Sequence, residues 1–145
     1  MKLPDYIIVD EVKRVCKELG IRDWTSLKEP VVTADEAKKI LAEVNVAKMP
    51  IALDDFRIGL EVELEHGTVF PDANVTNNHP VLTGKIVMAH MKESLDYYQR
   101  LDVAEIEGDM AKAAAKGDAA KLLAKYKKLV QAKHELAEAE KKAAG

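Results

Sequence analysis

Apolar residues recur at every third or fourth position in successive segments of this chain, and no segment shows a convincing alternation of apolar and polar residues. A repeat of three to four places apolar side chains on one face of an α-helix, whereas a strand needs a repeat of two. The pattern therefore predicts an all-α protein. Its main helices are expected at residues 5–19, 34–44, 53–66, 80–106 and 118–142.

Several predicted helix ends carry capping residues. Thr33 and Glu36 form a capping box, in which the threonine side chain accepts from the glutamate amide and the glutamate reaches back. Asp5 and Asp118 stand at the start of predicted helices, where an aspartate side chain can accept from free amides. Gly67 follows the apolar stripe of the third helix and is expected to be its C-terminal stop.

The composition of the chain changes near residue 108. Residues 53–107 hold 4 basic and 11 acidic side chains, a net charge of −7, whereas residues 108–145 hold 9 basic and 5 acidic, a net charge of +4. An acidic centre favours cations and disfavours phosphate. The sequence predicts a compact helical core domain at 1–107 and an Ala/Lys/Glu-rich helical extension at 108–145.

Composition also limits the partners and the location of the protein. The formal net charge of −3 gives no general attraction for nucleic acid. No apolar run approaches the roughly 18 residues of a membrane-spanning helix, and the N-terminus lacks a signal-peptide core. The single cysteine, Cys16, cannot form an internal disulfide. A reducing, cytoplasmic location without membrane attachment is therefore expected.

Two pairs of histidine and glutamate stand three residues apart, Glu63 with His66 and His90 with Glu93. On a helix this spacing puts both members of a pair on one face. Helical geometry places Glu63 and His90 nearest the core and His66 and Glu93 at its rim. The two helices are expected to be antiparallel neighbours, because a short loop joins them. Imidazole and carboxylate together suit Zn, Fe or Mn, so these four residues are candidate ligands of a divalent transition metal ion.

A purely structural interpretation of the same residues stays open. Glu-x-x-His is the order found in carboxylate-bridged metal bundles, and His90 with Glu93 has the reverse order. His66 can interact with the C-terminal end of its helix, His90 can be a hydrogen-bonded core histidine, and Glu93 can be a surface carboxylate. The chain is then a non-enzymatic interaction or assembly module without a cofactor. No residue set points to a substrate, so the sequence does not decide whether the protein is an enzyme.

The connection that follows the third predicted helix has two interpretations. Asp72 to Asn77 offers oxygen atoms on alternate residues, as the first half of a calcium loop does, but Thr83 occupies the twelfth position, where such a loop needs a bidentate glutamate. Asn, Asp and Thr side chains also cap turns within their own loop. The sequence favours this second interpretation.

Several short motifs occur in order across the middle of the chain. They are Glu61-Val62-Glu63-Leu64-Glu65-His66-Gly67, Asn74-Val75-Thr76-Asn77, Leu82-Thr83-Gly84-Lys85-Ile86, Ala89-His90, Glu93 and Asp96-Tyr97-Tyr98. Over about residues 33–104 the chain resembles a family of small prokaryotic and phage-associated proteins, catalogued as a domain of unknown function. Leu95 departs from the family, in which Pro is common there. The resemblance implies no activity, but it implies a shared centre that includes Tyr97, and an association with virions or mobile elements.

The predicted helix at 118–142 is amphipathic, with apolar residues at three-to-four spacing and lysines on the other face. Such a helix can pack on its own domain or pair with another chain. The lysines are mixed with glutamates and lack an aromatic platform, which fits a solvated face better than a nucleic-acid site. The sequence predicts a homo-oligomer or a protein partner that uses this helix.

Overall fold

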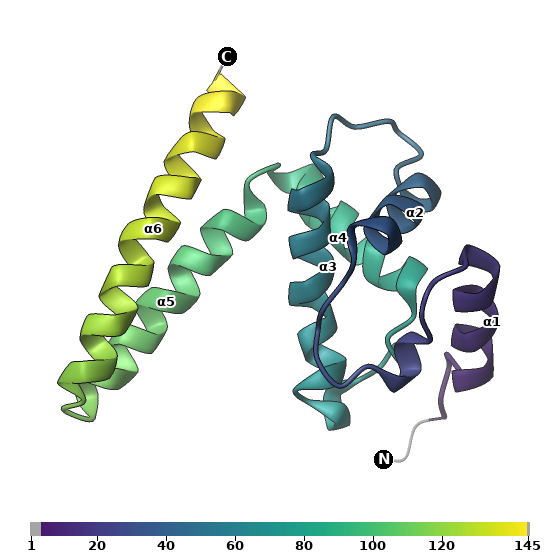
Figure 1. Cartoon of the computed structure of the whole chain (residues 1–145), viewed down its shortest axis with the longest axis horizontal. Helices are drawn as coiled ribbons and strands as arrows, with labels where there is room; N and C mark the ends of the chain where they lie inside the picture. The colour runs from purple at the N-terminus through teal and green to yellow at the C-terminus, as the bar shows by residue number, and fades with distance from the viewer. Residues whose placement is uncertain (1–3, 145) are drawn as a thin grey trace. The chain divides into compact units, whose positions relative to one another are not determined.

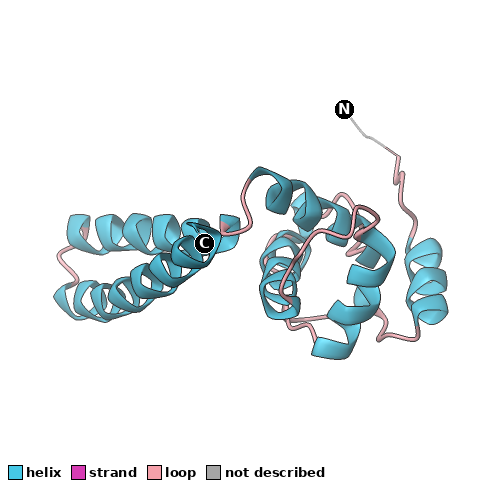
Figure 2. Cartoon of the chain, turned by 90° about the horizontal axis from the view of Figure 1, so that it is seen from above, coloured by secondary structure: helices cyan, strands magenta, loops and turns pink. Residues whose placement is uncertain are grey.

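The computed structural model describes residues 4–144, which form helices joined by loops, with no strand among them (Figure 1, Figure 2). This confirms the all-α prediction. The α-helices of the described residues are α1 (Val9–Leu19), α2 (Ala34–Val44), α3 (Leu53–Thr68), α4 (Pro80–Glu93), α5 (Tyr97–Ala115) and α6 (Ala119–Ala144), with short 3-10 helices η1 (Trp24–Ser26) and η2 (Pro71–Ala73). None of these helices combines the length and the apolar character that crossing a membrane requires.

The chain divides into two compact units, Met1–His90 and Met91–Gly145. The composition boundary near residue 107 lies inside α5 rather than between two elements. The predicted division of the chain at 107 therefore stays a prediction, and the two units are described separately below.

The core of the first unit is built from the apolar faces that the helical repeat predicts. Trp24 of η1 is completely buried, and so are Ile40 of α2, Phe56 and Leu60 of α3, and Val87 of α4. These side chains are large, and each contributes roughly 1.5–3 kcal/mol when it is removed from water. The core is formed by side chains from several helices, which fixes the places of α3 and α4 within the unit.

Glu36 is the one acidic side chain among the buried residues of α2, and it holds together the segment that leads into this helix. The predicted capping box is confirmed: the Glu36 amide donates to Thr33 Oγ1 at 3.2 Å, and Thr33 N donates to Glu36 Oε2 at 2.9 Å. Arg22 donates to both carboxylate oxygens, at 2.9 and 2.7 Å, and Trp24 Nε1 donates to Oε1 at 3.3 Å. Burial by itself raises the pKa of Glu36, but these hydrogen bonds outweigh it and lower the pKa to about 2.

Two predicted helix ends are wrong. Asp5 does not cap the first helix, because α1 begins at Val9 and Ile8 is its N-cap residue, without a side-chain hydrogen bond. Gly67 does not end the third helix, because α3 continues to Thr68. The hydroxyl of Thr68 donates to a main-chain carbonyl one turn earlier, which keeps the last turn helical.

The helix predicted at 80–106 is interrupted between Glu93 and Tyr97, so it forms α4 and part of α5. At the break, the Asp96 carboxylate accepts hydrogen bonds from the Ser94 hydroxyl and from Arg100. Short polar side chains that bond locally compete with the helical main-chain pattern. The apolar repeat continues across the break and for that reason does not reveal it.

The second unit is built around α5 and α6, which pack as a helical hairpin (Figure 1). Ile106, Leu129 and Ala132 form its small buried cluster. Lys125 Nζ lies 2.5 Å from Asp109 Oδ2 across the hairpin. The predicted cap on α6 is present, since Lys121 N donates to Asp118 Oδ1 at 3.0 Å. The helix predicted at 118–142 is therefore confirmed as α6, the second arm of this hairpin.

We predict that Glu36→Gln lowers the free energy of unfolding by about 2 kcal/mol, the size typical of hydrogen bonds to a buried charged group. The wild type should also lose stability as the pH falls from 4.5 toward 2, because the unfolded carboxyl binds a proton there before the folded one does. Urea denaturation of both proteins across this pH range measures the two effects.

The matched control for Glu36→Gln is Asp35→Asn on the neighbouring residue. The Asp35 side chain is 70% exposed and pairs with Lys39 on the helix surface. Its replacement should cost about 0.5 kcal/mol or less. Equal losses in the two variants would contradict the role given to the buried carboxylate.

Candidate functional site

The Glu63 carboxylate lies between two imidazole rings, those of His66 and His90. Its Oε1 is 3.5 Å from His90 Nε2, and its Oε2 is 3.7 Å from His66 Nδ1. The Glu63 side chain is only 9% exposed, whereas His90 is 29% and His66 is 67% exposed. The structure thus brings two of the predicted ligands, His66 and His90, to the carboxylate of a third, Glu63.

His66 and Glu63 lie one helical turn apart on α3, and their contact is local. His66 Nδ1 is also 3.1 Å from the main-chain oxygen of Glu63, which suits a ring that carries its proton on Nδ1. The other ring nitrogen, Nε2, is then the acceptor. Because the ring is mostly exposed, it can turn about its side-chain bonds without disturbing the core.

His90 comes from α4, so its contact with Glu63 joins two helices that are far apart in sequence. Glu93 is the last residue of α4, one turn after His90, and is exposed. Its role as a fourth ligand stays a prediction. As they stand, no three His, Cys, Asp or Glu side chains within residues 4–144 form a group that could hold a metal ion.

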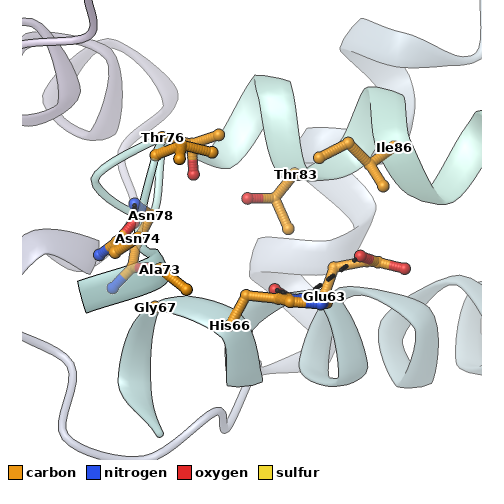
Figure 3. Close-up of a pocket in the computed structure, with 10 residues that line it drawn as sticks. Glu63, His66, Gly67, Ala73, Asn74, Thr76, Asn78, Thr83 and Ile86 are labelled. Atoms are coloured by element: carbon orange, nitrogen blue, oxygen red, sulfur yellow. Dashed lines mark hydrogen bonds and ion pairs between the residues drawn. The ribbon is translucent and has the colours of Figure 1, made fainter. Parts of the chain in front are cut away.

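A pocket of about 200 Å³ opens beside this cluster (Figure 3). Glu63, His66 and Gly67 line it from α3, and Thr83 and Ile86 line it from α4. The loop between the two helices closes the remaining side with small and polar residues, which are Ala73, Asn74, Val75, Thr76 and Asn78. The carboxylate and one imidazole therefore face a space that solvent and small molecules can enter.

Three consecutive loop residues tie this pocket wall to the rest of the first unit. Asn77 Nδ2 donates to the main-chain oxygen of Ile7 at 2.6 Å, and Asn78 Nδ2 donates to that of Trp24 at 3.3 Å. His79 Nδ1 accepts from the amide of Leu82 at 3.3 Å, in the first turn of α4. The sequence reasoning missed this role, although the Asn-Asn pair directly before His-Pro was its signal, since asparagine tolerates the left-handed main chain that a sharp turn needs.

The geometry of the loop supports the capping interpretation of its polar residues. Asn77 and Asn78 have φ angles of 49° and 58°, which favour asparagine over most other non-glycine residues. The main-chain amide of Asn78 donates to Asn74 Oδ1 at 3.3 Å, so two residues of the loop are hydrogen-bonded to each other. These contacts hold Asn74 and Asn78 against the end of α3.

Residues 12–107, about two thirds of the chain, match the family described as a protein of unknown function (DUF5661). The chain belongs to the DUF5661 family. The match includes Glu63, His66, His90, Glu93 and Tyr97, and it ends inside α5, so α6 lies outside it. No curated protein and no solved structure matches the chain.

Gly67 marks a close approach within the DUF5661 match. A Cβ atom at this position would lie 1.8 Å from Asn78 Oδ1 and 2.7 Å from Asn74 Nδ2. The main chain of Gly67 is helical, as part of α3, so its conformation does not require glycine. Glycine is needed here because the two asparagine side chains occupy the space where a Cβ atom would lie. Any larger side chain must displace these two asparagine side chains or the loop that carries them.

We predict that Gly67→Ala lowers the free energy of unfolding by about 2 kcal/mol, the usual cost of forcing an extra methyl group into a packed contact. The control is Gly108→Ala in α5, where a Cβ atom meets nothing within 4 Å. There the alanine should raise stability by roughly 0.5–1 kcal/mol, because glycine is a poor helix former. Urea denaturation tests both, and a stabilised Gly67→Ala would show that the loop does not press on α3.

Proposed function

We propose that this protein binds a divalent transition metal ion through Glu63, His66 and His90, with Glu93 as the candidate fourth ligand. The observation that carries the proposal is a nearly buried carboxylate with an imidazole nitrogen within 4 Å of each oxygen. Imidazole and carboxylate are the ligands that Zn, Fe and Mn share in proteins.

The separation of the side chains is close to the one that a shared ion requires. Two ligand atoms, each about 2.0–2.2 Å from a tetrahedral ion, lie roughly 3.4 Å apart. The Glu63–His90 separation of 3.5 Å is near this value. Small side-chain movements would therefore let an ion bridge the carboxylate and the imidazole.

His66 requires a larger adjustment. Its Nδ1 faces the main-chain oxygen of its own helix, so the ring must turn to present a nitrogen to the ion. Because this ring is mostly exposed, the rotation costs little free energy. The acidic region 53–107, with 4 basic and 11 acidic side chains, favours a cation over an anion at this place.

The competing function is an interaction module in which the cluster is structural. One observation favours it: no group of three candidate ligands within residues 4–144 stands ready to hold an ion. A Glu63–His90 contact between two helices can also stabilise the fold without any bound ion, since a buried carboxylate needs a polar partner. In this case His90→Ala lowers stability and changes no binding property.

The deciding experiment measures the metal content of the untagged protein after incubation with Zn, Fe and Mn salts and removal of free ions. We expect about one ion per chain in the wild type and none in the double variant His66→Ala, His90→Ala, because three ligands are the least that a bound ion of this kind uses. His134→Ala is the matched control, because this histidine is exposed on α6. Its metal content should equal that of the wild type.

Titration of the loaded protein with a chelator then gives the affinity. Glu93→Gln should weaken binding if the fourth ligand is correctly assigned and leave it unchanged if three side chains suffice. The affinity should fall as the solution is made more acidic, because protons compete with the ion for its ligand atoms. If the protein takes up no ion under any of these conditions, the metal-binding proposal is wrong and the structural interpretation holds.

A further inference from the structure

His79 lies at the start of α4 and combines three features in one residue. Its ring is buried, with the residue 8% exposed. Its Nδ1 accepts from the amide of Leu82 at 3.3 Å, and its main-chain oxygen accepts from the amide and the hydroxyl of Thr83, at 2.9 and 3.0 Å. His79 is thus the capping residue of α4, and a titratable ring supplies the cap.

We propose that His79 is an acid-sensitive cap: protonation of its ring breaks the hydrogen bond to Leu82 and opens the first turn of α4 together with the adjoining Asn77–His79 segment. This device goes beyond the proposed metal site and does not depend on it. It gives the first unit a conformational response in the mildly acidic range.

The hydrogen-bond chemistry of imidazole supports this response. A ring that accepts at Nδ1 is neutral and carries its proton on Nε2. After protonation both nitrogens are donors, and the amide of Leu82 loses its acceptor. The new positive charge also lies at the positive end of the helix dipole of α4, which is unfavourable.

The charged groups around His79 come from two helices. Glu11 on α1 favours the protonated ring, but Arg14 binds both oxygens of this carboxylate, at 2.8 and 2.7 Å. Arg14 itself and Lys85 on α4 add positive charge that disfavours protonation. Burial is the largest effect. It outweighs Glu11 and a hydrogen bond to the main chain of His79, which both raise the pKa, and holds the pKa of His79 below its usual value of 6.5.

The sign of the pH dependence follows from this lowered pKa. In the unfolded or locally opened chain the ring binds a proton near pH 6.5, whereas in the closed form it does not. Stability of the closed form is therefore complete above pH 6.5 and falls as the pH drops from 6.5 toward the pKa of the closed form.

Opening at His79 would reach the pocket wall, because its neighbours hold the loop in place. Asn78 lines the pocket and donates to the main chain at Trp24, and Asn77 donates to the main chain at Ile7. Thr83, whose hydroxyl donates to His79, lines the pocket from the other side. Loss of the cap therefore loosens two sides of the same cavity.

The test is amide hydrogen exchange followed by NMR, expressed as protection factors so that the intrinsic pH dependence of exchange is removed. Between pH 7.5 and 5.5 we expect the protection of Leu82 and Thr83 to fall about fivefold, the effect typical of losing one helix cap. In His79→Asn, where asparagine caps without titrating, this fall should be absent. Amides of α6, in the other unit, serve as an internal reference.

His134→Asn is the control variant, since this exposed histidine lies on α6, and it should reproduce the fall seen in the wild type. Protection that does not change with pH, or a fall that persists in His79→Asn, would overturn the proposal. If His79→Asn does not fold, the ring of His79 is titrated directly in the wild type. A ring that titrates at or above pH 6.5 would equally overturn it.

Discussion

The first unit depends on the segment Asn77–His79, in which each residue satisfies main-chain groups of a different element. Asn77 bonds to Ile7, two residues before the start of α1, Asn78 bonds to η1, and His79 bonds to the first turn of α4. The two asparagines adopt left-handed conformations to do this. Because Gly67 leaves room for Asn78 against α3, the segment also sets the distance between that helix and the loop. The pocket beside Glu63 exists because these bonds hold its wall in place.

Local and periodic features of the fold were predictable from the sequence, and features that rest on distant partners were not. The buried faces around Ile40, Leu60 and Val87 follow from the helical repeat, and the Thr33–Glu36 box follows from residues three apart. The Asn77–Ile7 bond joins residues 70 positions apart, and no local pattern contains it. The break at Ser94–Asp96 was missed for another reason, since the apolar repeat continues through it while polar side chains compete with the helix.

The candidate site was predictable in part for the same reason. Helical angles placed Glu63 nearest the core and His66 at the rim, and their side chains are 9% and 67% exposed. The angles also placed His90 near the core, and in the structure its Nε2 lies 3.5 Å from Glu63 Oε1. Angles on two separate helices do not give the distance between side chains at their rims, so the relation of Glu93 to this cluster could not be derived. The ring orientation of His66 depends on its contact with the main-chain oxygen of Glu63, which the apolar repeat does not predict either.

The structural and the metal-binding interpretations differ most in the role that they give to His66. A buried carboxylate that joins two helices needs a polar partner for folding, and His90 supplies one. His66 is largely exposed, and an exposed contact of this kind adds little to stability. Folding therefore explains Glu63 and His90 without a need for His66. The proposed metal site gives His66 a role, because this imidazole lines the pocket one helical turn from the buried carboxylate.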